Sequence, residues 1–316
     1  MRLRTLRLIV AAAVVGAVVA SAPAGQATTG YYNTYQDEGA TPSVGEHTGA
    51  QGFAAGADYL YSIKNRSRDD GSAVIYRVPK STEKAQLMTN GANGSKSIAG
   101  LGHANDMTIV GIGGVNHFFV VTMSSGAYQL KKLQYSGNTY KEVGKFAVKE
   151  NGVTKAVSGI SRVTVTSTAL TFFFKSGASV YKGTIPATSN SGTVAITKAF
   201  TLGTSGALVD GKPINLSGFL NQGFYYHESK KVLYYPMTKG NVSIVLVYRN
   251  VSATSTGTIA PTKDLSFRIT SKKYSRFEIE SVGISSTDGK LYFSTNRSNS
   301  SSGNLDGVHV FERYVA

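Results

Sequence analysis

The sequence predicts an all-β protein, because apolar runs alternate with turn residues along most of the chain and helical periodicity is hard to find beyond the N-terminus. An aromatic-rich apolar run recurs five times, and the steps between successive runs are 58, 53, 61 and 59 residues. The runs occupy residues 59–61, 117–121, 170–174, 231–235 and 290–294. A period of about 50 residues with several strands per unit is typical of a β-propeller. The sequence therefore predicts a single domain, a five-bladed β-propeller.

The first 27 residues predict a secretory signal peptide that precedes this domain. Arg2, Arg4 and Arg7 form a basic region, residues 8–19 are apolar, and small residues follow up to Ala27. Cleavage is expected after Ala27, with sites after Ala22 and Ala24 as alternatives. The apolar stretch is short for a membrane span, so we expect a secreted, extracellular protein whose mature chain has no membrane span.

The repeat divides residues 28–316 into expected blades. In each, a short first strand precedes the aromatic run, and a third strand with a Tyr or Phe near its end follows. The blades are expected at roughly 51–99, 100–152, 153–212, 213–270 and 271–316. The last blade ends after its third strand, and an open sheet edge invites aggregation. We therefore expect residues 28–36 to close the ring as its outer strand, and residues 37–50 to form a loop.

Composition limits the classes of partner. The chain has no cysteine, which excludes disulfides, thiol nucleophiles and thiolate metal sites. Its formal net charge is +15, and removal of the three N-terminal arginines leaves +12. For a secreted protein this charge favours a cell-surface glycan or an anionic wall polymer as partner, and we expect no nucleic acid. A second interpretation is that the basic residues only keep the surface soluble.

Polar residues at the starts of the expected inner strands form the candidate site. Inner strands line the central channel of a propeller, so their starts should converge at one mouth of it. The residues expected there as ligand-binding groups are Gln51, His103, Asn105, Asp106, Arg162, Glu278 and Glu280.

The residue types in this set bear on three kinds of chemistry. Glu278 and Glu280 lie two apart on a strand and so point the same way, as an acid/base pair would. His103, Asp106 and one Glu could hold a cation in the channel, although no spacing is diagnostic of a metal and no cofactor is predicted. No Gly-x-Ser-x-Gly elbow supports a serine hydrolase. A purely structural role is the alternative for each residue.

A family resemblance rests on three short segments, at residues 51–54, 103–107 and 278–282. With them the chain resembles the secreted helveticin J-like class III bacteriocins, and more distantly the propellers of teichoic-acid-associated and phage receptor-binding proteins. The resemblance implies a five-bladed propeller that acts on bacterial surfaces. Related propellers serve as targeting subunits of secreted toxin complexes, so other subunits of such a complex are potential partners.

The leading functional hypothesis is therefore a lectin-like propeller that binds bacterial cell-envelope polymers and contributes to antagonism between bacteria. One alternative is an enzyme of the same fold that cleaves an envelope glycan or phosphodiester with Glu278, Glu280 and His103. A structural subunit of a secreted complex is the other. The sequence favours binding over catalysis without deciding between them.

Overall fold

The computed structural model describes residues 30–316 except 67–70, 264, 300 and 302, together with all described side chains except that of Leu265. The predicted signal peptide and residues 28 and 29 lie outside the described residues. The prediction of an all-β fold is confirmed, since the described residues form strands β1 to β29 and no helix. Accordingly, this part of the chain contains no helical segment that could cross a membrane.

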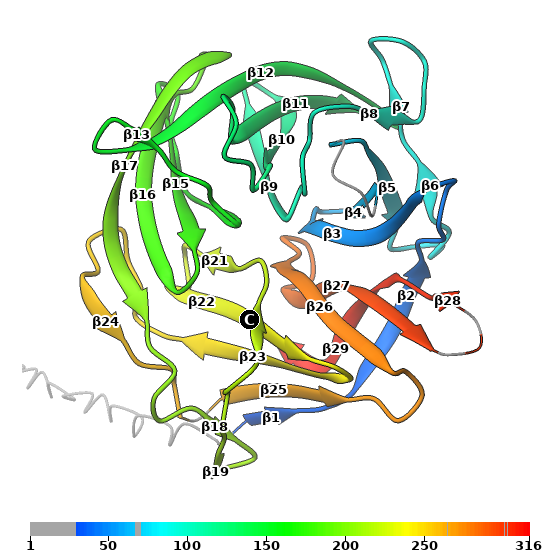
Figure 1. Cartoon of the computed structure of the whole chain (residues 1–316), viewed down its shortest axis with the longest axis vertical. Coiled ribbons are helices and arrows are strands. Elements are labelled where there is room, and N and C mark those ends of the chain that lie inside the picture. Colours follow the sequence, from blue (N-terminus) through cyan, green and yellow to red (C-terminus); the bar gives the residue numbers. More distant parts are fainter. Residues whose placement is uncertain (1–29, 67–70, 264, 300, 302) are drawn as a thin grey trace, which may run out of the picture.

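The strands form groups of mainly antiparallel neighbours arranged around a common centre, which makes the fold propeller-like (Figure 1). The first group contains β3 (His47–Ala55), β4 (Tyr59–Arg66), β5 (Ala73–Pro79), β6 (Gln86–Leu87) and β8 (Ser97–Ile98). The second contains β9 (Asp106–Ile112), β10 (Val115–Val121), β11 (Leu130–Ser136) and β12 (Thr139–Glu150), with β7 (Thr89–Asn90) and β13 (Val153–Thr154) paired to β12. The third contains β14 (Gly159–Val165), β15 (Ala169–Ser176), β16 (Ser179–Pro186) and β17 (Ser191–Leu202).

Two further groups complete the ring. The fourth contains β20 (Leu220–Asn221), β21 (Tyr225–His227), β22 (Val232–Lys239), β23 (Val242–Tyr248), β25 (Leu265–Thr270) and β1 (Gly30–Tyr32). The fifth contains β26 (Arg276–Ile284), β27 (Lys290–Asn299), β28 (Gly303–Asn304), β29 (Gly307–Val315) and β2 (Tyr35–Ala40). A separate hairpin is formed by β18 (Leu208–Val209) and β19 (Lys212–Pro213), and β24 (Gly257–Ile259) pairs with β17.

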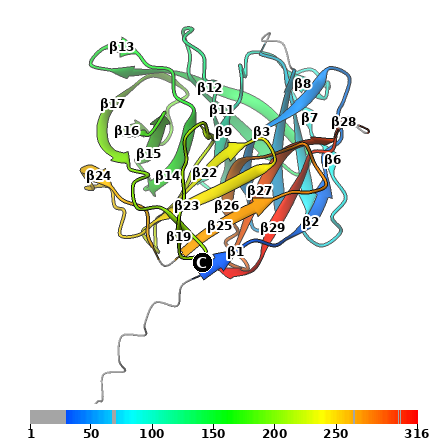
Figure 2. The ribbon, with the colours of Figure 1, turned by 60° about the horizontal axis from the view of Figure 1, so that its bottom comes forward.

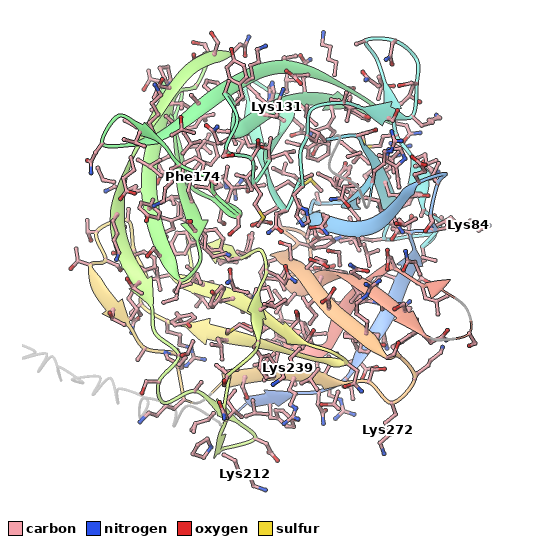
Figure 3. The ribbon with its side chains drawn as sticks, in the orientation of Figure 1. Lys84, Lys131, Phe174, Lys212, Lys239 and Lys272 are labelled. Atoms are coloured by element: carbon pink, nitrogen blue, oxygen red, sulfur yellow. The ribbon has the colours of Figure 1, made fainter. Side chains whose placement is uncertain are left out.

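The aromatic runs form the second strand of each group because this strand is buried on both faces. On β15, Phe172 faces the second group and lies 4.9 Å from the ring of Phe119. Phe173 points the other way and lies 5.1 Å from Tyr226 of the fourth group. Both are fully buried, as is Phe174, which lies inside the ring in Figure 3. An uninterrupted aromatic run is therefore the pattern that stacking between neighbouring groups requires.

Parallel pairing covers several outer edges, which the repeat alone did not predict. The outer strands β12 and β17 pair in parallel from Lys145↔Ser191 to Glu150↔Ile196, so the second and third groups share one sheet. In the same way β24 pairs with β17, and β1 pairs with β25. These pairings supply partners for backbone groups that an open edge would leave exposed.

The N-terminal strand β2 pairs antiparallel with the C-terminal strand β29, and the two lie side by side in Figure 2. This corrects the expected boundaries, because residues 37–40 continue the strand instead of starting a loop, while Gly30–Tyr32 pair with β25 of the fourth group. A bulge between Asp37 and Gly39 lets the strand continue. Asp37 also anchors it, since its Oδ1 lies 2.9 Å from Arg297 Nη1 and 2.7 Å from His309 Nδ1.

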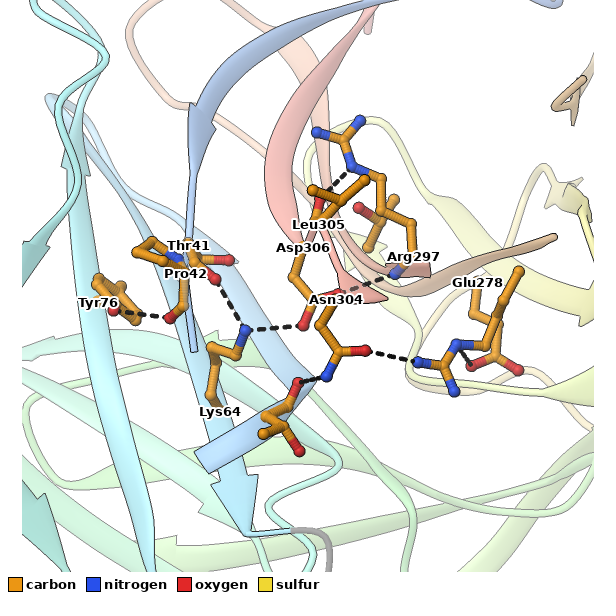
Figure 4. A network of polar contacts seen from close by, with 12 residues as sticks. Thr41, Pro42, Lys64, Tyr76, Glu278, Arg297, Asn304, Leu305 and Asp306 are labelled. Carbon is orange, nitrogen blue, oxygen red and sulfur yellow. Dashed lines mark hydrogen bonds and ion pairs between the residues drawn. The ribbon is translucent and has the colours of Figure 1, made fainter. Parts of the chain in front are cut away.

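A buried ion pair connects this closure to the first group (Figure 4). Lys64 Nζ on β4 donates to Asp306 Oδ2 at 2.8 Å and to the carbonyl oxygen of Thr41 at 2.8 Å. Both charged side chains are fully buried. Each ion therefore depends on the other, and removal of one partner from such a pair typically costs about 3–5 kcal/mol.

The closure should be sensitive to acid. Burial lowers the pKa of His309 to about 4, while Thr295 Oγ1 lies 2.7 Å from its Nε2. Between pH 6.5 and 4 the unfolded chain takes up a proton at this position and the folded protein does not, so protonation favours unfolding. We predict that the stability advantage of the wild type over His309→Gln shrinks by about 2–3 kcal/mol as the pH falls through this window. Urea denaturation of both proteins at several pH values measures this difference in the free energy of unfolding. A difference that does not change with pH would contradict the prediction.

Candidate functional site

Asp106 lies at the centre of the ring, where it receives hydrogen bonds from several strand groups. Its Oδ2 accepts from the backbone N–H of Ile160 at 3.0 Å and of Phe224 at 3.1 Å. Its Oδ1 accepts from the hydroxyl of Ser281 at 2.7 Å and from the N–H of Met107 at 3.0 Å. One fully buried carboxylate thus joins the second, third, fourth and fifth groups.

The backbone around Asp106 can approach this closely because two of its neighbours are glycines. A Cβ atom on Gly223 would lie 2.8 Å from Ser281 Oγ and 2.9 Å from Asp106 Cγ. A Cβ atom on Gly52 would lie 2.8 Å from the carbonyl oxygen of Ala104, which accepts the N–H of Gly52 at 2.9 Å. The first group therefore reaches the same centre through its backbone.

Electrostatics at the centre depend on a buried lysine. Burial raises the pKa of Asp106 to about 7, while Ser281, the N–H groups of Ile160 and Phe224, and Lys175 lower it. Burial lowers the pKa of Lys175 to about 7, and Asp106 raises it. Because four donors point at the two carboxylate oxygens, the arrangement fits the ionised form of Asp106.

The structure separates the seven predicted site residues. Gln51, Asn105, Asp106 and Glu280 are buried, and Asn105 uses its side-chain amide to donate to the carbonyl oxygen of Ser158 at 2.6 Å. His103 and Glu278 are half-buried at the starts of the inner strands, and Arg162 is exposed. Arg162 lies two residues beyond Ile160 along β14, on the other side of the Asp106 contact. The seven residues therefore do not meet at one mouth.

Glu278 and Glu280 do share one face of β26. Phe277, Ile279, Val282 and Ile284 all face one apolar core, which requires one extra residue between positions 279 and 282. A bulge between Ile279 and Ser281 supplies this extra residue.

Burial, followed by the charge of Glu278, raises the pKa of Glu280 well above its usual range. The side chain of Glu280 is nearly inaccessible, since the residue is 2% exposed, whereas Glu278 is half-buried.

Within the described residues, no three His, Asp or Glu side chains come close enough to hold a metal ion. His103 and Asp106 are also directed differently. Both carboxylate oxygens of Asp106 accept hydrogen bonds from other residues of the protein. His103 instead lies beside a separate groove that includes Thr122 and Tyr128.

A cavity of about 620 Å³ lies on the opposite side of the Asp106 contact, toward the ends of the inner strands. All five strand groups contribute to its wall. Its lining includes Ala55, Asn116, Arg162, Tyr225, His227 and Ser286. Its volume falls in the range of sites that enclose small ligands.

Among the described residues, two cationic side chains of this cavity have no ionic partner, while its tyrosine, histidine and glutamate contact the protein. In the part of the chain that the structure describes, the guanidinium of Arg162 and the ammonium of Lys230 make no ion pair. Burial raises the pKa of the Tyr225 hydroxyl, and the nearby charge of Arg162 lowers it. Burial, followed by the charge of Lys230, lowers the pKa of His227, which favours the neutral ring. The cavity thus combines a tyrosine with donors and acceptors of several kinds.

One hydrogen bond positions the rim between the third and fourth groups. Glu228 Oε1 accepts from Thr164 Oγ1 at 3.0 Å, which leaves its second oxygen available. The N–H of Lys230 and the hydroxyl of Ser229 both approach His227 Nδ1, at 3.4 and 3.3 Å. The turn at 228–230 is therefore held in place by short-range contacts.

Sequence reasoning found Arg162 but missed Asn116, His227 and Lys230. The cavity could have been predicted by examining the polar residues near the end of each inner strand as well as those near its start. Residues that follow the starting positions by several places lie beyond the central contact and surround the cavity.

Comparisons with known proteins do not assign a family. No family model matches the chain, and no curated protein matches its sequence. The tail fiber of Staphylococcus aureus phage P68 is similar in structure at 10% identity and a TM-score of 0.49, covering 89% of this chain and 53% of that chain. A luciferin-regenerating enzyme is similar at 11% identity and 0.42, covering 86% and 94%. A variant of the Aleuria aurantia lectin, in complex with alpha-methyl-L-fucoside, is similar at 12% and 0.33, covering 84% and 80%. None of these proteins supplies a role for a residue of this chain, and the resemblance to helveticin J-like bacteriocins stays a prediction.

The central contact should be essential for folding. We predict that Asp106→Asn lowers the free energy of unfolding by at least about 3 kcal/mol, because an amide places a donor against backbone donors and removes the anion near Lys175. Urea denaturation measures the loss. Asp58→Asn is the matched control, since Asp58 is an exposed aspartate and should change stability little. Equal stabilities of the two variants would show that Asp106 does not hold the groups together.

Proposed function

We propose that the protein is a secreted, five-bladed, lectin-like β-propeller that binds glycans in the cavity at the ends of its inner strands. The observation that carries the proposal is the cavity itself. It is lined from all five strand groups, and it brings a tyrosine together with Arg162, His227 and Asn116. The five strand groups and the five aromatic runs support the blade count.

The chemistry of the cavity suits a sugar. A sugar ring presents an apolar face to an aromatic side chain and hydroxyl groups that both donate and accept hydrogen bonds. Arg162 and Lys230 offer donors only, while Glu228 offers an acceptor. The excess of cationic groups over Glu228 also suits a glycan that carries an acidic substituent.

Bacterial cell-envelope polymers are the class of glycan that we propose. The expected signal peptide supports secretion, and the net charge of +12 of the expected mature chain favours adsorption to anionic wall polymers. Lys84, Lys212 and Lys272 extend from the outer edge of the ring, where they would meet such a surface (Figure 3). A contribution to antagonism between bacteria, alone or as a targeting subunit of a toxin complex, rests on the family resemblance.

The enzyme hypothesis is less well supported. Neither Glu278 nor Glu280 lines the cavity, and Glu280 is almost fully buried. A general acid and base must reach the bond that they cleave. The pair therefore suits a structural role at the start of the inner strand β26.

The proposal is tested by binding of the purified mature protein to an array of bacterial envelope glycans. We predict that Arg162→Ala and Tyr225→Phe each weaken binding to the glycans that are retained by about tenfold or more, since each removes one polar contact to the ligand. The melting temperatures should stay close to that of the wild type. Tyr225→Phe keeps the ring that packs against the core.

Lys272→Ala is the control, because it removes a basic charge from the outer edge and leaves the cavity unchanged. Retention of no glycan would contradict the proposal and favour a structural subunit. Equal losses for Lys272→Ala and Arg162→Ala would show that binding depends on overall charge instead of on the cavity.

A further inference from the structure

A second hollow continues outward from the cavity, between the first and second strand groups. It has a volume of about 440 Å³ and shares Gly56, Ala57, Asn116 and Tyr135 with the lining of the cavity. Because four residues border both spaces, the two hollows adjoin, and together we call them the depression. We call the outer part the Tyr59 groove.

An ordered pair of side chains forms one wall of the Tyr59 groove. The guanidinium carbon of Arg77 lies 4.8 Å from the centre of the Tyr59 ring. Gln86 Oε1 accepts from Arg77 Nε at 3.0 Å and from Nη2 at 2.8 Å, which holds the guanidinium in place. The guanidinium and the aromatic ring are therefore already ordered in the protein without a ligand. A ligand that stacks on the ring would cost little side-chain entropy.

The floor of the groove is aromatic, and its rim is low. The rings of Tyr61 and Tyr135 lie 5.2 Å apart beneath it, and both residues are nearly buried. Gly114 and Gly137 border the groove in turns with φ of 79° and 54°, where other residues would be strained. Gly114 and Gly137 themselves therefore add no side chain at the rim of the groove.

We infer that the Tyr59 groove is a second sugar subsite, and that the whole depression binds a linear glycan chain of several residues instead of a single sugar or a chain end. The inference rests on the proposed function. One sugar unit would occupy the cavity beside Arg162 and Tyr225. The next units would pass Asn116, which is exposed and borders both hollows, and stack on Tyr59.

Calorimetric titration with soluble oligomers of defined length tests the inference. The probes are chito-oligosaccharides, which are neutral, and oligogalacturonates, which are acidic, each with one, three and six residues. In the series that binds, we expect the hexamer to bind at least about tenfold more tightly than the monomer, because only the longer chain reaches the second subsite. Tyr59→Ala should remove most of this gain and leave the affinity for the monomer unchanged, whereas Arg162→Ala should weaken both.

Tyr128→Ala is the matched control. Tyr128 is exposed where Tyr59 is half-buried, and it too carries a cation over its ring, since Lys145 Nζ lies 4.6 Å from the centroid, but it borders a different groove. This variant should bind all lengths as the wild type does. Equal affinity for all lengths, or equal losses for monomer and hexamer in Tyr59→Ala, would overturn the inference while leaving binding in the cavity intact. Binding of neither series would overturn the inference, and retention of a branched or single-sugar glycan on the array would then show that the proposed function survives without it.

Discussion

The carboxylate of Asp106 is the interaction on which the arrangement of the strand groups depends. It accepts the N–H groups of Ile160 and Phe224 and the hydroxyl of Ser281, so residues separated by up to 175 positions meet at one buried group. A buried carboxylate without its donors would cost several kcal/mol, and each donor would be left unsatisfied as well. The centre of the ring is therefore held by polar contacts, while the aromatic layers hold the space between groups.

This contact also separates the internally bonded polar residues from the cavity in which we propose that a ligand binds. Because Asp106, Gly223 and Gly52 bring the backbones together, the polar residues on one side of them are drawn into internal hydrogen bonds. Asn105 donates to Ser158, and Glu280 is nearly inaccessible. On the other side the inner strands surround the cavity, where Arg162 and Lys230 keep their charges unpaired within the described residues. The internally bonded polar residues and the proposed binding cavity thus lie on the two sides of one contact.

Much of the fold could be predicted because burial of the second strand on both faces requires a local pattern of apolar residues that the sequence shows directly. A strand buried on both faces needs consecutive apolar residues. Phe172 to Phe174 satisfy that need, and similar aromatic runs recur at steps of 53 to 61 residues. The central contact could not be predicted in the same way. Three of the four donors to Asp106 are backbone N–H groups. Because every residue except proline carries such a group, no residue type in the sequence indicates this pairing.

The seven candidate residues and the cavity overlap little for a related reason. The starts of the inner strands were expected to surround an open mouth, but Asp106 closes the space there, and only Arg162 of the seven residues lies in the cavity. The N-terminal closure was expected a few residues too early, because the bulge after Asp37 and the pairing of that side chain with Arg297 and His309 depend on residues far away in the chain.

A crystal structure of the mature protein with a bound oligosaccharide tests the central claim most directly. The account predicts that the sugar lies in the cavity beside Arg162 and Tyr225, on the side of Asp106 toward the ends of the inner strands. A sugar bound beside His103 and Glu278, at the starts of those strands, or only on the outer loops, would contradict it.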